Sequence, residues 1–224
     1  MKFRELAWTA FIYPKIAGGG NTAYGRLASD KEFIQRLQTT PSINEFEQLR
    51  DFLVHFGVHY TPKNYGEQLL VLWPKVEPHI KALVGHTLEN CDLDERLILS
   101  NIRGLYDCLA YGAWGGDTVV SKVLHFFNIH LFPMWDIGIG IEYTAQIGSL
   151  GYLEFLKAMQ QHAVEVTEDF HQLNLQGQPA EFLSYKLGYT FTRPLTKFLD
   201  DYNWVTITRN WPQDIPDWLL DLRC

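Results

Sequence analysis

The feature of this sequence that most constrains its fold is a cluster of glycines between two segments with strongly periodic apolar residues. Gly112, Gly115 and Gly116 fall within five residues, and glycine allows backbone conformations that other residues avoid. On either side, apolar residues recur at the spacing that buries one face of a helix. The pattern therefore predicts two helices, residues 95–110 and 118–127, that are joined by a glycine hairpin.

The connection after the second helix brings a carboxylate next to an apolar stretch. Pro133 forces the residue before it into an extended conformation, and Phe132, Met134 and Trp135 surround the approach to Asp136. Such surroundings remove water from a carboxylate and raise its pKa, as many active sites require. An aspartate at this place can also cap the helix that follows it. Both a chemical role and a capping role for Asp136 are consistent with the sequence.

A glycine hairpin, a short apolar helix, an irregular apolar connection and an aspartate that opens another helix follow one another over residues 112–136. This order resembles the helix-hairpin-helix DNA glycosylase superfamily, the group of endonuclease III and the 8-oxoguanine glycosylases. In that family the hairpin holds a DNA phosphate through backbone amides, and an aspartate after the connection assists cleavage of the bond between base and sugar. The family hairpin reads roughly Leu-Pro-Gly-Val-Gly, where this chain has GAWGG. The resemblance implies that Gly115 and Gly116 bind a phosphate and that Asp136 is the catalytic carboxylate.

Four side chains near the hairpin are further candidates for the site. Bifunctional members of the family carry a lysine nucleophile after the hairpin, and Lys122 is the candidate for that role here. Lys122 and His125 are three residues apart on the predicted helix, so both can face a cleft and supply a charge or a proton. The alternative is a lysine on an exposed helix face. Trp114 and Trp135 can stack on an extruded base, or they can belong to the core.

Two functions from different classes fit these residues. The first is hydrolysis of an N-glycosidic bond in a nucleic acid or a nucleotide, with Asp136 stabilising a developing sugar cation or positioning water. The alternative is a non-catalytic helical module that binds nucleic acid or a protein partner, in which Asp136 only caps a helix. The net charge of −7 counts against tight binding of duplex DNA, because that affinity comes largely from basic residues that neutralise phosphates.

No cofactor and no metal centre are expected. Cys91, Cys108 and Cys224 are widely spaced and form no CxxC pair. His55 and His59 are four residues apart, but a glycine lies between them, so we interpret them as ordinary histidines at a helix end. The odd number of cysteines and the lack of an apolar run of about 18 residues predict a cytoplasmic protein without a membrane span.

The whole sequence predicts a mostly α, glycosylase-like fold in a single helical domain over residues 1–224. The resemblance places a cleft between two packed helical lobes, with a boundary near residue 112. We interpret the glycine-rich residues 18–21 as a connector, and the alternating residues 204–208 as a lone strand or an extended arm. Further helices are predicted at 2–12, 29–38, 42–56, 64–84 (kinked or divided at Pro74 and Pro78), 149–173, 180–187, 195–202 and 214–222. Ser29 and Asp30 start the helix at 29–38, and Ser42 with Glu45 forms a capping box at the start of the helix at 42–56.

Overall fold

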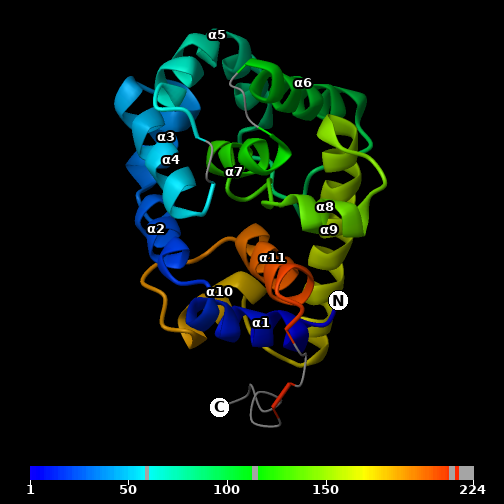
Figure 1. The fold of residues 1–224 in the computed structure, drawn as a ribbon. Coiled ribbons are helices and arrows are strands. Elements are labelled where there is room, and N and C mark those ends of the chain that lie inside the picture. Colours follow the sequence, from blue (N-terminus) through cyan, green and yellow to red (C-terminus); the bar gives the residue numbers. More distant parts are fainter. Residues whose placement is uncertain (59–60, 113–115, 212–214, 217–224) are drawn as a thin grey trace.

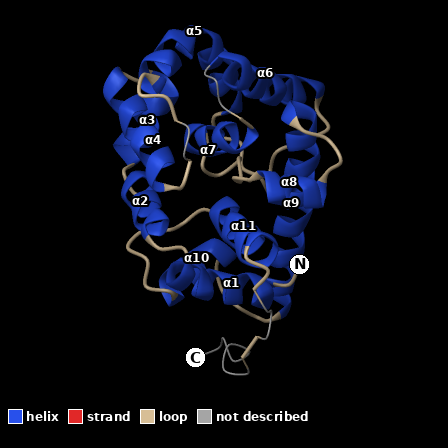
Figure 2. Ribbon diagram, viewed as in Figure 1, coloured by secondary structure: helices blue, strands red, loops and turns tan. Residues whose placement is uncertain are grey.

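The computed structural model describes residues 1–58, 61–112, 116–211 and 215–216. Every regular element in these ranges is a helix (Figure 2), which confirms the predicted mostly α fold. The elements are α1 (Phe3–Ile16), α2 (Gly19–Ala28), α3 (Lys31–Thr39), α4 (Ile43–His55), α5 (Tyr65–Leu83), α6 (Arg96–Gly112), α7 (Asp117–Phe127), α8 (Ile137–Tyr143), α9 (Gly148–Gln172), α10 (Pro179–Lys186), α11 (Leu195–Asn203) and the π-helix η1 (Trp204–Thr208). None of the described helices is both long enough and apolar enough to span a membrane.

Helix α7 lies at the centre of the molecule, and the other helices surround it (Figure 1). In this view α2, α3 and α4 lie on one side, α5 and α6 above, α9 on the opposite side, and α1, α10 and α11 below. All residues from Val120 to Phe127 are buried. One connected hydrophobic core includes buried side chains from every described α-helix. Polar residues on α7 are therefore held inside the protein.

Helix starts that were predicted from capping residues are confirmed. At the start of α3, Oδ1 of Asp30 accepts from the backbone N–H of Phe33 at 2.9 Å. At the start of α4, Ser42 and Glu45 form the predicted capping box, with the Ser42 backbone nitrogen 2.9 Å from Oε2 of Glu45. Gly57 follows this helix with a φ of 83°, a conformation that favours glycine. These starts follow from the sequence because each depends on residues three apart.

The prolines of α5 do not divide it, so of the two predicted alternatives division at Pro74 and Pro78 is wrong, and a kink there stays a prediction. Each proline removes one helical hydrogen bond. The two prolines are four residues apart and both are exposed, so they lie on the solvent side of the helix. Carbonyl groups that lose a partner there can bond to water, and the buried stripe of Leu72, Val76 and Ile80 stays continuous.

The two glycine clusters differ in how well they were predicted. The helices predicted around the hairpin are confirmed as α6 and α7. The prediction of a connector at residues 18–21 is wrong, because α2 begins at Gly19. Of these glycines Gly18 alone has a positive φ, of 62°, so the turn between α1 and α2 takes only Ala17 and Gly18, and the next glycines are helical.

Residues 204–208 form η1, so the prediction of a strand or an extended arm is wrong. The Thr206 hydroxyl donates to the carbonyl oxygen of Tyr202 at 2.8 Å, and Val205 packs with residues of α1. Direct continuation from α11 and this packing outweigh the β-propensity of the run. The helix predicted at residues 214–222 falls largely outside the described residues.

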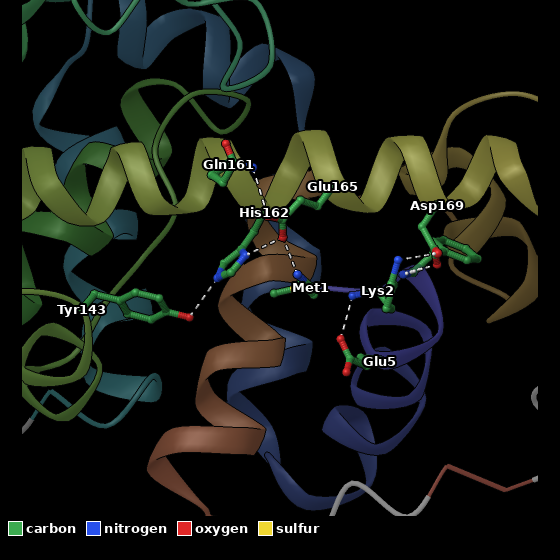
Figure 3. Close-up of polar contacts among 9 residues, drawn as sticks. Met1, Lys2, Glu5, Tyr143, Gln161, His162, Glu165 and Asp169 are labelled. Atoms are coloured by element: carbon green, nitrogen blue, oxygen red, sulfur yellow. Dashed lines mark hydrogen bonds and ion pairs between the residues drawn. The ribbon is translucent and has the colours of Figure 1, made fainter.

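The first residues of the chain are held against α9 by polar contacts (Figure 3). The Met1 amino group forms an ion pair with Glu165, and Nζ of Lys2 is 3.3 Å from Oδ1 of Asp169. Nδ1 of His162 is 3.4 Å from Oε2 of Glu165. The hydrogen bond from the amino group is the main cause that lowers the pKa of Glu165 to about 2. These contacts fix the start of α1 on the helix that also borders α8.

Candidate functional site

Asp136 is the N-cap residue of α8, and both of its carboxylate oxygens have partners. Oδ1 accepts from the backbone N–H of Ile139 at 2.9 Å, and Oδ2 accepts from the Thr208 hydroxyl at 3.0 Å. Asp136 is half-buried and Thr208 is exposed. The capping role is therefore present in the structure. A ligand can compete more easily for Oδ2, because the partner of Oδ2 is an exposed side chain rather than a helix backbone.

Lys122 lies on the buried side of α7 and is 6 % exposed. The alternative of a lysine on an exposed helix face is therefore wrong. Its ammonium group is 5.4 Å from the ring centroid of Phe56, and it forms no hydrogen bond or ion pair with the described residues. Burial lowers the pKa of this ammonium, while the negative charges of Asp200 and Asp136 oppose the lowering. A buried lysine in this state can act as an amine nucleophile or as a cation that awaits an anion.

His125 lies on the same helix but is fully enclosed in the core. Its Nδ1 is 2.6 Å from the carbonyl oxygen of Phe132, and its Nε2 is 3.1 Å from the hydroxyl of Tyr24. Because a carbonyl oxygen can only accept, we assign the ring proton to Nδ1, and Nε2 then accepts from the tyrosine. Burial lowers the pKa of His125 to about 3. The imidazole is thus neutral and fully bonded, and it serves as a structural link between α7 and α2.

Trp135 belongs to the core, which is one of the two roles that the sequence allows for it. Its side chain is buried, and its indole N–H donates to the carbonyl oxygen of Asp117 at 3.2 Å. The ring packs against Tyr152 and Phe155, with centroid separations of 5.4 and 5.3 Å. A base could stack on this ring only if those neighbours moved.

The hairpin is only partly within the described residues. Trp114 and Gly115, both predicted to belong to the site, lie outside them. Gly116 is the N-cap of α7 with a φ of −63°, a value open to any residue. Asp117, the first residue of α7, accepts from the Tyr106 hydroxyl at 2.6 Å and from the first N–H of α9 at 3.2 Å. Asp117 therefore joins the end of the hairpin to α6 and α9.

A group of four buried charged residues around α11 was not predicted, and we call it the α11 charge cluster. It consists of Arg193, Lys197, Asp200 and Asp201, of which none is more than 6 % exposed. Nζ of Lys197 is 2.6 Å from Oδ2 of Asp200 and forms a second ion pair with Asp201. Nη2 of Arg193 is 3.3 Å from Oδ2 of Asp201. Two cations and two carboxylates thus neutralise one another in the interior.

The α11 charge cluster extends electrostatically to the predicted site. The charges of Asp200 and Lys197 both act on the pKa of Lys122, in opposite directions. Lys122 adds a third cation to this buried region, and Asp136 adds a carboxylate at its edge. The arrangement brings the two main residues of the sequence prediction into one electrostatic environment, between α7, α8 and α11.

The sequence carried a weak signal for this cluster. Lys197, Asp200 and Asp201 have the i, i+3, i+4 spacing of helical ion pairs. Such pairs usually lie on exposed faces, so the spacing does not predict burial. The cover comes from distant helices, because the rings of Tyr13 and Tyr24 lie 4.3 and 5.2 Å from the Lys197 ammonium.

Among the described residues, no group of three or more His, Cys, Asp or Glu side chains could hold a metal ion. Comparison of this chain with protein-family models, with curated proteins and with solved structures found no match.

Proposed function

We propose that this protein hydrolyses the N-glycosidic bond of a nucleotide, either free or within a nucleic acid, as the helix-hairpin-helix glycosylases do. The observation that carries the proposal is Lys122, a residue only 6 % exposed whose ammonium group forms no hydrogen bond or ion pair in the described part of the chain. It lies on the helix that follows the hairpin. The charge of Asp136 acts on it, and these are the two residues to which the family resemblance assigns chemistry.

In the proposed reaction Lys122 is the nucleophile. Burial lowers its pKa and so increases the fraction of neutral amine near pH 7. Nζ attacks C1′ of the sugar while the bond between C1′ and the base nitrogen breaks. The base leaves with the bonding electron pair and takes up the proton that the attacking amine loses. The sugar ring then opens to give an imine between C1′ and Nζ, and water hydrolyses this imine to release the sugar and the free lysine.

Asp136 supplies negative charge in this reaction. Its carboxylate stabilises the positive charge that develops on the sugar as the bond to the base breaks. Oδ1 keeps its place at the start of α8, while Oδ2 exchanges the Thr208 hydroxyl for the substrate. We therefore expect η1, which carries Thr208, to shift when substrate binds.

A non-catalytic helical module that binds nucleic acid or a protein partner is the second candidate. One observation favours it: both carboxylate oxygens of Asp136 are already hydrogen-bonded, as a purely structural cap requires. In that case Lys122 pairs with an anionic group of the partner, and no covalent bond is broken.

The test measures base release from a panel of modified oligonucleotides and free nucleotides. Wild type is compared with Asp136→Asn and Lys122→Met, and Glu142→Gln, which alters an exposed carboxylate on α8, is the matched control. Asp136→Asn should lower turnover by about two orders of magnitude or more with little change in melting, because asparagine caps as well as aspartate but carries no charge. Lys122→Met should abolish the covalent adduct that borohydride traps in the wild type. Glu142→Gln should retain both activities.

The outcomes separate the two candidates. A wild type that binds oligonucleotides but releases no base from any substrate favours the binding module. Undiminished turnover in Asp136→Asn removes this aspartate from the mechanism. An unchanged adduct in Lys122→Met assigns the nucleophile to another residue.

A further inference from the structure

Two neighbouring pockets lie along the segment that joins α10 to α11. The larger, of about 790 Å³, is bordered by α3, by residues 84–87 and 128–130 and by residues 190–192. The smaller, of about 370 Å³, lies between α2 and residues 189–193. Both are lined by Ser29, Thr190 and Phe191, so they lie next to each other, and we call the two together the Phe191 groove. Neither Lys122 nor Asp136 lines it.

The Phe191 groove is positive although the protein is acidic. Its described lining contains no aspartate or glutamate, but it contains Arg26, Lys31 and Arg193, in a chain of net charge −7. Arg26 and Lys31 are exposed, and neither forms an ion pair with the described residues. The carboxylate of Asp30, next to Lys31 in the sequence, is used as the cap of α3. Arg193 is already paired with Asp201, so the cations that favour an anionic ligand here are Arg26 and Lys31.

The smaller pocket also contains polar atoms that lack hydrogen-bond partners. Arg193 is 1 % exposed, and its Nε, Nη1 and Nη2 have no hydrogen-bond acceptor in the described part of the chain. The hydroxyl of Tyr189, from the same lining, is a further donor without a partner among the described residues. The guanidinium is held by Asp201 at 3.3 Å, and Cζ is 4.5 Å from the Tyr189 ring centroid. Because unmet buried donors are costly and charge-assisted hydrogen bonds are strong, an oxyanion is the ligand that fits this end.

The larger pocket suits a flat, mostly apolar group. Its volume lies in the range of small-molecule sites, and its apolar lining comes from Ala28, Ile34, Val84, Ile129 and Phe191. Gln35 and Gln38 add amide groups; Nε2 of Gln38 donates to the carbonyl oxygen of Phe127 at 2.8 Å, which leaves its carbonyl oxygen to accept from a ligand. An aromatic base can stack on Phe191 and exchange hydrogen bonds with such amides.

We propose that the Phe191 groove binds a free nucleoside monophosphate, with the phosphate at Arg26 and Arg193 and the base in the larger pocket. The two ends match the two halves of this ligand, an oxyanion and a planar base. The shared residues Ser29 and Thr190 place hydroxyl groups where the sugar lies between them. This site is independent of the glycosidase proposal, because the two have no residue in common.

The test is calorimetric titration of the full chain with AMP, GMP, CMP and UMP, with adenosine, inorganic phosphate and a single-stranded oligonucleotide as further probes. We expect at least one monophosphate to bind with a Kd below about 1 mM, and its nucleoside and inorganic phosphate to bind at least roughly tenfold more weakly. Arg26→Ala and Lys31→Ala should each weaken binding by roughly fivefold or more. Lys63→Ala, which removes an exposed lysine that lines neither pocket, should leave it unchanged.

Each contrary result overturns the proposal. Failure of all four monophosphates to bind refutes it, as does binding that is equally weakened by Lys63→Ala. Binding of the oligonucleotide alone assigns the groove to a strand instead of a free nucleotide. Because Arg26 and Lys31 are exposed, their variants should fold, which circular dichroism verifies. Base-release activity plays no part in this test, so its outcome does not depend on the glycosidase proposal.

Discussion

Replacement of Lys197 by methionine should destabilise the protein strongly, because it leaves two buried carboxylates without their main cation. Lys197 is fully buried and pairs with both Asp200 and Asp201. Burial alone would lower the pKa of Lys197, but the negative charges of the two aspartates outweigh it and raise the pKa above its ordinary value. The ammonium is thus charged in the folded protein, and methionine keeps most of the length of the side chain while removing the charge.

The magnitude follows from the burial of the pair. Removing one partner of a buried ion pair costs about 3–5 kcal/mol. In a chain of 224 residues, 1 kcal/mol shifts Tm by roughly 2–4 °C, so the expected fall in Tm is roughly 6–20 °C. Arg193 remains 3.3 Å from Asp201 and offsets part of the loss. The deficit should shrink as the pH falls, because burial raises the pKa of Asp201 and protonation then removes its charge.

Thermal melting followed by the helical circular dichroism signal measures the effect. The matched control is Lys81→Met, which breaks an exposed pair with Glu77 at 2.9 Å and should change stability by less than about 1 kcal/mol. The double variant Lys197→Met with Asp201→Asn should recover part of the lost stability, because it removes one stranded charge. If Lys197→Met melts at the same temperature as Lys81→Met, the α11 charge cluster is not buried as described.

Three further predictions concern pH and backbone space. Burial alone would raise the pKa of Glu45, but the hydrogen bonds of the capping box hold it at about 2. The stability that the Glu45 carboxylate contributes is complete above about pH 4.3 and is lost as the pH falls towards 2. Glu45→Gln should therefore flatten the dependence of the urea-unfolding free energy on pH over that interval. His125 has a pKa of about 3 in the folded protein and about 6.5 in the unfolded chain. Its contribution to the free energy of unfolding is therefore present above about pH 6.5 and is lost as the pH falls towards about 3. His125→Phe should reduce the slope of this free energy against pH by about 1.4 kcal/mol per pH unit in that interval. A Cβ at Gly151 would collide with the carbonyl oxygen of Gln146, so Gly151→Ala should cost roughly 2 kcal/mol or more. Gly116→Ala meets no atom within 4 Å and should cost less than about 1 kcal/mol, and equal melting of these two alanine variants would contradict the packing at Gly151.

The sequence predicted what depends on neighbours along the chain. Asp30 and Ser42 were recognised as helix starts because a cap acts within one turn. Lys122 was recognised as a candidate, but its burial was not, because the cover over α7 comes from helices that are remote in the sequence. The groove around Phe191 left no local signal, since its walls come from four separate segments of the chain. The strand expected at residues 204–208 failed for the same reason: contact with α1 decided its form.

The distribution of charge, rather than its sum, decides which anion this protein can bind. Lys122, Arg193 and Lys197 are buried, so they add little to the field far from the surface, which the net charge of −7 dominates. A duplex carries one charge per roughly 1.7 Å and reaches well beyond any single groove, so it meets that repulsive field. A mononucleotide in the Phe191 groove senses mainly charges within the Debye length of about 10 Å at 0.1 M salt. Added salt should therefore weaken the binding of the mononucleotide, and it should also weaken the repulsion between the protein and a duplex. If the affinity for a duplex instead falls steeply as salt is added, the protein has a basic face that binds DNA.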